Sequence, residues 1–280
     1  MTDQTIAQSP ANAAAPEQLA PRRRSRWLEA ALLPLSLTVL ITAWHVAVKV
    51  FEVPSYIVPS PAETAVALGR IFTGGLLWEN FAVTLLEAFS GFGIGFVLAL
   101  VMAILITEVR LFEKAVYPYV AALQSMPKVA LAPLIVLWFG FGIESKITMS
   151  ALLCFFPMLV NFVGGFRAAD EMRIRLLRVL DASKWQIIRH VRLPSALPFV
   201  LAGVELGAIY AMLGAIVAEF VGARHGIGFW LMQMNATMDS AGSFAILALL
   251  AAYGICIQAL LRFARRKLLF WNGARTTEEH

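Results

Sequence analysis

Charged residues are scarce in this sequence. Asp, Glu, Lys and Arg make up 15% of its 280 residues, whereas soluble globular domains contain about 25%. Hydrophobic residues make up 59%. A soluble globule could not cover that much apolar surface, so the composition excludes this class and indicates a membrane protein. The apolar segments are spread evenly along the chain, which predicts one membrane domain rather than two domains.

Residues that bind metals or form disulfides are also few. The two cysteines, Cys154 and Cys256, lie in apolar segments without the spacing of metal ligands, and we interpret them as packing residues. The four histidines are scattered, and none has a partner at the spacing of a metal site or a proton relay: His45, His190, His225 and His280. The sequence therefore predicts no metal, no cofactor and no enzymatic activity.

A phosphate-binding loop is missing as well. No segment matches G-x4-G-K-[ST], so the chain cannot hydrolyse ATP by that route. If the protein moves a solute against its concentration gradient, the energy must come from a separate nucleotide-binding subunit or from an ion gradient.

The positive charges are unevenly distributed. A net charge of +5 invites a nucleic-acid interpretation, but most of the 23 Lys and Arg fall in four segments: 22–26, 108–114, 166–192 and 262–275. Such clustering in alternate loops is typical of cytoplasmic segments of membrane proteins. It predicts that both termini are cytoplasmic and that no nucleic acid is bound. Residues 1–26 are expected to be a disordered tail, 27–267 a membrane domain and 268–280 a second tail.

Six apolar segments are long enough to be membrane spans. They cover about 30–48, 81–107, 115–139, 146–166, 199–221 and 242–261. The first could instead be a signal peptide, but it is longer than a typical signal and no small-residue cleavage site follows. Prolines interrupt the third near Ser125-Met126-Pro127-Lys128. The predicted fold is an all-α membrane protein with six transmembrane helices and a cytoplasmic loop between spans four and five.

That loop, residues 166–198, is the one long polar interruption. Apolar residues recur in it at helical spacing, which predicts two short helices joined near Asp181–Ser183, with Ser183 capping the second. Leu193-Pro194 and Pro198 are expected to end the second helix. An ordinary basic loop is the alternative, but an unstructured loop has no need of apolar faces. We therefore expect the helices to dock on another protein.

The stretch ending Val191-Arg192-Leu193-Pro194 resembles the cytoplasmic coupling loop of ABC importer permeases. The family pattern is Glu-Ala-Ala, three residues, Gly, nine residues and Ile-x-Leu-Pro. Aligned on Leu193-Pro194, the Gly position is Asp181, and both Asp181 and Arg175 depart from the pattern. The resemblance implies an ATPase-coupling role for these positions and their neighbours: Arg175, Leu176, Leu177, Leu180, Asp181, Ala182, Ser183, Trp185, Leu193 and Pro194.

Further segments resemble the nitrate, sulfonate, taurine and bicarbonate branch of that family. They are Pro54–Pro61, Met126–Gly140, Phe155–Asn161 and Ala218–Gly228. The resemblance implies a multi-pass protein of the bacterial inner membrane, surrounded by lipid. It implies a homodimer with two copies of an ATP-binding subunit and a periplasmic solute-binding protein. The implied substrate is a small organic or inorganic anion; the alternatives are a thiamine pyrimidine precursor, riboflavin or an aromatic carboxylate.

Several ionisable residues fall inside the predicted spans. Lys128, Glu205 and Glu219 are candidates for the translocation pathway, because charged groups in spans often mark one. Family members often have a basic residue where Glu205 stands. The same groups, together with Glu87, could form the ion or proton pathway of a secondary transporter or channel, although six spans are few for a transporter built from inverted repeats. We expect Lys128 to pair with Glu205 or Glu219; the alternative is a solvated Lys128 in a watery vestibule.

Overall fold

The protein is built from α-helices. The computed structural model describes residues 26–268, and within that range every regular element is a helix. The chain divides into two units, one ending at Phe51 and one beginning at Glu52. The first unit contains α1 (Arg26–Val50), whose apolar part is Pro34–Val50. The predicted tails fall almost entirely outside the described residues. The all-α fold class is confirmed.

Long apolar helices make up most of the second unit. Four are long and apolar enough to cross a membrane: α3 (Leu76–Glu108), α6 (Ile143–Arg167), the continuous run Lys184–Gly222 that includes α9 (Leu193–Gly222), and α11 (Ser240–Leu268). A bent helix pair over residues 110–139 would make a fifth span. Six spans therefore remain a prediction, because Pro34–Val50 is shorter than these helices.

The predicted interruption of the third span is confirmed. Helix α4 (Arg110–Ser125) stops before Pro127, and the chain continues as η1 (Lys128–Leu131) and α5 (Ala132–Phe139) at 91° to α4. Pro118, by contrast, lies inside α4 without ending it. The loop expected at 108–114 is reduced to Val109, the only residue between α3 and α4.

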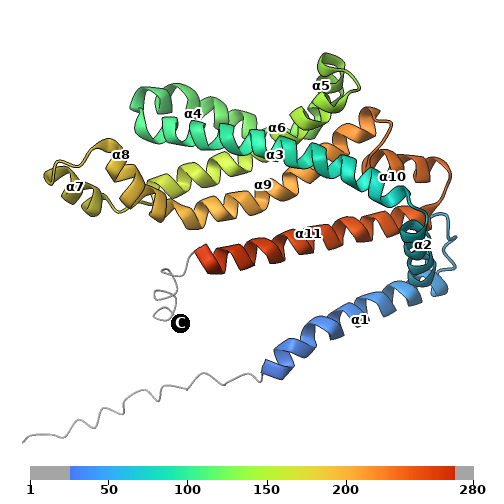
Figure 1. Cartoon of the computed structure of the whole chain (residues 1–280). Coiled ribbons are helices and arrows are strands. Elements are labelled where there is room, and N and C mark those ends of the chain that lie inside the picture. The colour runs from blue at the N-terminus through green and yellow to red at the C-terminus, as the bar shows by residue number, and fades with distance from the viewer. Residues whose placement is uncertain (1–25, 269–280) are drawn as a thin grey trace, which may run out of the picture. The chain divides into compact units, whose positions relative to one another are not determined.

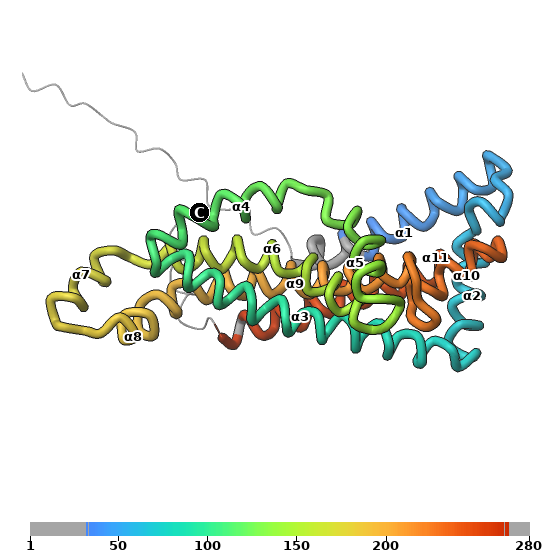
Figure 2. The backbone as a smooth tube through the Cα atoms, turned by 90° about the horizontal axis from the view of Figure 1, so that it is seen from above, coloured from blue at the N-terminus to red at the C-terminus, as the bar shows by residue number. Residues whose placement is uncertain are grey.

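Helix α6 lies at the centre of the second unit and packs most extensively against α3 and α9 (Figure 2). Small residues at the helix contacts allow this close packing. A Cβ on Gly95 of α3 would lie 3.0 Å from the carbonyl oxygen of Ala151, and one on Gly207 of α9 would lie 2.7 Å from the Met158 side chain. The sequence Gly91-x-Gly93-x-Gly95 predicts that a neighbouring helix approaches closely, as small residues allow in membrane proteins. The structure confirms this for Gly91 and Gly95, whereas Gly93 faces open space.

The short helices gather at the two ends of this bundle (Figure 1). Helices α7 (Glu171–Val179) and α8 (Lys184–Ile187) lie at one end, and α2 (Pro61–Thr73) and α10 (Ile227–Ala236) lie at the other. The sequence predicts a short amphipathic stretch around residues 62–72, and the structure forms it as α2. The segment 222–240, which the sequence predicts to be the outer loop before the last span, contains α10, whose apolar run from Ile227 packs against α9 and α11.

The prolines at 194 and 198 do not end a helix, contrary to the prediction. Helix α8 continues through one π-helical stretch, η2 (Ile188–Arg192), directly into α9. Pro194 lies in the first turn of α9. A proline there is compatible with helical φ, and the wider π turn before it accommodates the missing hydrogen-bond donor. The segment Lys184–Gly222 is therefore one uninterrupted rod.

Changing Gly214 to alanine should destabilise the protein. A Cβ on Gly214 would lie 2.6 Å from the Cα atom of Ser150 and 2.8 Å from the carbonyl oxygen of Met149, and backbone atoms of α6 cannot move aside cheaply. We expect Gly214→Ala to cost about 1–3 kcal/mol, measured as a lower thermal unfolding midpoint in detergent. Gly93→Ala is the matched control, since no atom lies within 4 Å of its Cβ. Equal midpoints for the two variants would contradict the close helix contact.

Candidate functional site

The polar loop between α6 and α9 folds as two short helices. The Asp170 side chain caps α7 by accepting a hydrogen bond from the Met172 amide at 2.8 Å. Ser183 caps α8 in a reciprocal capping box with Gln186. Asp181 between them has φ of +53°. The predicted helix pair and the Ser183 cap are confirmed, and Asp181 adopts the left-handed conformation that a glycine would adopt more easily.

One face of this loop packs on itself. Ala169, Ile174, Ile187 and Val191 form a small buried cluster, with the half-buried Leu177 and Ala182 packed against it. This internal core holds α7 and α8 together. Two of the residues assigned by resemblance to coupling, Leu177 and Ala182, therefore contribute to the shape of the loop.

The opposite face is apolar and exposed. Five large side chains, each 60–80% exposed, form what we call the apolar stripe: Met172, Leu176, Val179, Leu180 and Trp185. On α7 they follow helical spacing and therefore share one face. Leu193 and Pro194 are also exposed, at the start of α9. The structure thus brings the predicted coupling residues together as one loop with an inner core and an outer apolar face.

Lys128 lies at the break after α4, where the prediction of an ion pair is wrong. Its ammonium group donates to the Gln124 carbonyl oxygen at 2.8 Å and lies 4.9 Å from the centre of the Phe156 ring. Within residues 26–268 it forms no salt bridge with Glu205 or Glu219. The broken helix exposes backbone carbonyls, and these take the place of a carboxylate. Glu205 is half-buried on α9.

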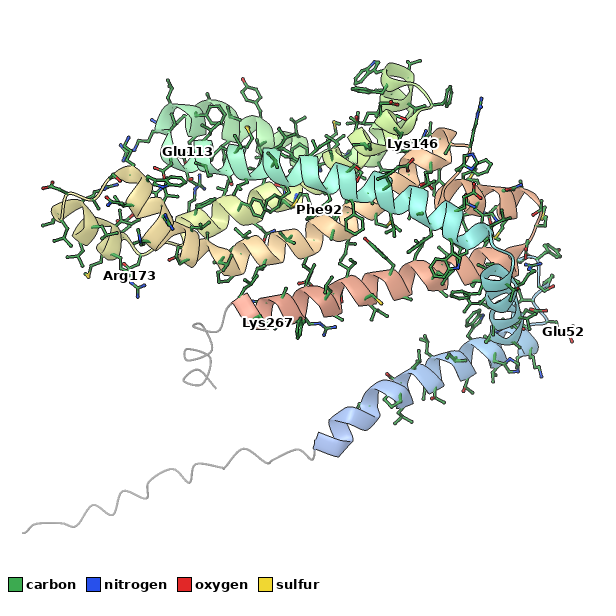
Figure 3. All side chains as sticks on the ribbon, viewed as in Figure 1. Glu52, Phe92, Glu113, Lys146, Arg173 and Lys267 are labelled. Atoms are coloured by element: carbon green, nitrogen blue, oxygen red, sulfur yellow. The ribbon has the colours of Figure 1, made fainter. Side chains whose placement is uncertain are left out.

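Glu219 belongs to a different environment, a buried polar cluster at the end of the bundle opposite α7. Four of its members are at most 3% exposed: Thr84, Glu87, Lys146 and Glu219. They come from three helices, α3, α6 and α9. Figure 3 labels Lys146 near α10, far from Arg173 on α7. Charged groups at such depth need partners within the protein.

The Glu219 carboxylate caps the start of α10. It accepts hydrogen bonds from the Thr84 hydroxyl at 2.7 Å and from the Gly228 amide. The Gly226 amide donates to the Asn80 side chain, and the Ile227 amide donates to Thr84, both at 2.8 Å. Side chains of α3 and α9 therefore satisfy the amides that a helix start leaves free. A Cβ on Gly228 would lie 2.8 Å from the Glu219 carboxylate, so the chain needs glycine there.

Lys146 connects the turn before α6 and the end of α9 to the cluster. Its ammonium group donates to the Phe141 carbonyl oxygen at 2.6 Å and to the Gly222 carbonyl oxygen at the end of α9. It also interacts electrostatically with Glu87 and Glu219. The charge distribution places Lys146 on the outer side, where the predicted fourth span begins, and in the structure it is buried near the start of α6. The sequence did contain a signal for this cluster. One lysine lies near the start of an apolar helix, and two glutamates lie in other apolar helices.

This cluster is suited to holding helix ends together rather than to reaction chemistry. Among the described residues, no group of three His, Cys, Asp or Glu side chains could hold a metal ion. One oxygen of Glu87 is buried without a hydrogen-bond partner. The remaining polar atoms tie α3, α6 and α9 to the turn at Phe141 and to α10.

Removing Lys146 should destabilise this end of the protein strongly. Lys146→Met would leave two buried glutamates without a cation, and we expect a cost of about 3–5 kcal/mol in thermal or denaturant unfolding. Arg70→Gln is the matched control. It breaks an ion pair with Asp239 at 2.5 Å, but the Arg70 side chain is 61% exposed, so the loss should stay below about 1 kcal/mol.

A double-mutant cycle tests the electrostatic origin of that effect. Glu87→Gln should reduce the damage done by Lys146→Met, because it removes one of the two acidic side chains with which Lys146 interacts. Strictly additive effects would show that Lys146 acts only through its two carbonyl contacts.

Comparison with known proteins agrees with this architecture. Residues 95–269 match the family described as "Binding-protein-dependent transport system inner membrane component". The chain is 36% identical over 242 residues to the riboflavin transport system permease protein RibX of Chloroflexus aurantiacus, covering 86% of this chain and 90% of the relative. It is 32% identical to the putative aliphatic sulfonates transport permease protein SsuC of Bacillus subtilis, covering 94% of each.

A third relative is the formylaminopyrimidine transport permease protein ThiX of Halalkalibacterium halodurans, 32% identical over 90% of this chain and 98% of the relative. Among solved structures, an amino acid ABC transporter superposes with a TM-score of 0.60 at 16% identity, covering 71% of this chain and 97% of that one. The MetNI methionine ABC transporter gives 0.52 at 22% identity, covering 69% and 94%. These two structural similarities show that the fold is shared, and nothing more.

The matched region includes the break at Pro127, the loop with its apolar stripe, Lys146 and Glu219. The curated relatives match over nearly their whole length. The chain belongs to the binding-protein-dependent family of ABC importer permeases, the non-enzymatic inner-membrane components of these transporters.

Proposed function

We propose that this permease forms the translocation pathway for a small organic anion of the sulfonate or taurine class. The observation that carries the proposal is the similarity to permeases named for such solutes. One is SsuC of Bacillus subtilis; another is the taurine transport system permease protein TauC of Escherichia coli, 28% identical over 92% of this chain. Two copies of the chain would form the pathway, with two ATPase subunits and a periplasmic binding protein.

A neutral or aromatic heterocycle is the second candidate. RibX and ThiX are named for riboflavin and formylaminopyrimidine, and their identities of 36% and 32% equal or exceed that of SsuC. Both candidates use the same fold and the same energy source, so the chemistry of the pathway must distinguish them.

The position and contacts of Lys128 favour the anionic substrate over the neutral or aromatic one. It lies at the 91° bend between α4 and α5, where the neighbouring Ser125 and Met126 are exposed in the single chain. Its ammonium group is held by backbone carbonyls and has no carboxylate partner among the residues described. Its full positive charge therefore remains available to a passing anion.

Transport measurements separate the two candidates. In proteoliposomes containing the permease, its ATPase and its binding protein, we expect uptake of labelled taurine or an alkanesulfonate. Lys128→Gln should slow that uptake about tenfold or more, the usual effect of losing a charge-assisted hydrogen bond. Arg224→Gln, an exposed cation just after the end of α9, serves as the charge-matched control. Riboflavin or pyrimidine uptake that is insensitive to Lys128→Gln, without sulfonate uptake, would favour the second candidate.

The loop carrying the apolar stripe is proposed to dock on the ATPase subunit. Five exposed apolar side chains on one small, internally packed unit form a surface suited to a groove in a partner. The exposed Arg173 and Arg189 would lie at the rim and steer the approach of the two subunits. This role fits a cytoplasmic location of the loop and of both termini, as the Lys and Arg distribution predicts.

Truncating the stripe should release the ATPase without harming the membrane domain. We expect Leu180→Ala combined with Trp185→Ala to weaken co-purification about tenfold or more, because central apolar anchors dominate interfaces. Both side chains are 67% exposed, so the unfolding midpoint should not change. Tyr56→Ala with Ile57→Ala removes similarly exposed side chains elsewhere and should retain the ATPase. Normal ATPase retention by the Leu180/Trp185 variant would refute docking through the stripe.

A further inference from the structure

A cleft of about 790 Å³ lies between the coupling loop and the ends of α3 and α4. We call it the cationic cleft, because five cationic side chains line it: Arg110, Arg175, Arg178, Lys184 and Arg192. Only two acidic side chains, Glu108 and Glu171, lie among them. The proposed transport function does not use this cleft.

The cleft is distinct from the apolar stripe, although both involve α7. Glu171, Arg175 and Arg178 lie on the side of α7 that faces the cleft, at the spacing of one helical face. Met172, Leu176 and Val179 are each one residue further along, about 100° around the helix. An ATPase seated on the stripe would therefore leave the cleft uncovered.

The charges inside the cleft are only partly balanced. Glu171 pairs with Arg175 at 3.1 Å, and Glu108 pairs with Arg192. In the described part of the chain, Arg110, Arg178 and Lys184 have no carboxylate partner. The Nε atom of Arg192 is buried and lacks a hydrogen-bond acceptor. A buried donor without an acceptor, beside several unpaired cations, indicates a missing anion.

The position of the cleft indicates where that anion comes from. Thr107 and Glu108 end the apolar helix α3, Arg110 begins α4, and Arg192 directly precedes α9. The ends of membrane-spanning helices lie at the depth of the lipid headgroups. Basic pockets between helices at that depth suit phosphate-bearing headgroups, and arginine matches phosphate oxygens with paired donors.

We propose that the cationic cleft binds the phosphate of an anionic phospholipid headgroup. The bound phosphate would accept hydrogen bonds from Arg178 on α7 and from Arg110 and Arg192 at the helix ends. It would thereby connect the coupling loop to the membrane spans through the lipid itself. Anionic lipid would then be a structural component of the assembled transporter.

The test is lipid binding to the purified permease–ATPase complex in detergent, using fluorescent phosphatidylglycerol as the probe and phosphatidylcholine as the comparison. We expect saturable binding of phosphatidylglycerol, weakened about tenfold or more by Arg110→Gln with Arg178→Gln. Arg262→Gln with Arg265→Gln removes the same charge from exposed positions on α11 and should leave this binding unchanged. Arg110→Lys with Arg178→Lys should retain part of it, which separates loss of charge from loss of folding.

Three outcomes would overturn the proposal. Equal phosphatidylglycerol binding by the Arg110/Arg178 and Arg262/Arg265 variants would show that the cleft is not the site. Complete displacement of the lipid by inorganic phosphate or ATP would assign the cleft to a free anion. Binding by the dissociated permease but not by the complex would show that the ATPase covers the cleft. None of these results bears on the transported solute, so the proposed function is tested separately.

Discussion

Within a bilayer there is no water to bind backbone amides and carbonyls, and this constraint governs the whole structure. Long uninterrupted helices satisfy it by their own hydrogen bonds. At two departures from a regular helix, side chains complete the hydrogen bonding of the backbone. At Pro127 the Lys128 ammonium group binds the Gln124 carbonyl. At the start of α10, Asn80, Thr84 and Glu219 accept hydrogen bonds from three consecutive amides. In both places, side chains supply the hydrogen bonds that the irregular backbone lacks.

The same constraint explains why the buried charges occur together. Glu219 is needed to cap α10, but a carboxylate in an apolar bundle requires a compensating cation. Lys146 supplies it and also binds the free carbonyls at Phe141 and Gly222. One group of side chains thus joins the ends of α3, α6, α9 and α10. The arrangement makes this end of the permease a single unit.

One helix connects the loop that carries the apolar stripe with the Glu219 cluster. The run Lys184–Gly222 begins in that loop, passes Pro194 after a π-helical turn and ends at the Glu219 cluster. Its 39 residues span about 60 Å at 1.5 Å per residue. The run therefore links this loop directly to the opposite end of the bundle, and helix α6 packs closely along α9.

The sequence by itself determined the features that depend on local chemistry. Scarcity of charge indicated a membrane protein, Pro127 marked the broken span, and Ser183 and Asp181 marked the cap and turn of the coupling loop. Glycines 91 and 95 indicated a close helix contact. Each of these follows from the properties of one residue and its near neighbours, which the sequence displays directly.

Only the tertiary structure decided which distant residues meet. Lys146 is separated by more than fifty residues from both Glu87 and Glu219, and no pattern within one helix shows that the three share a cluster. Lys128 was the more conspicuous cation, yet backbone carbonyls of its own broken helix satisfy it. Pro194 was expected to end a helix, but packing and a wider π turn carry the helix past it. In each case the partner of a polar group depends on how whole helices pack together, and helix packing is not a local property of the sequence.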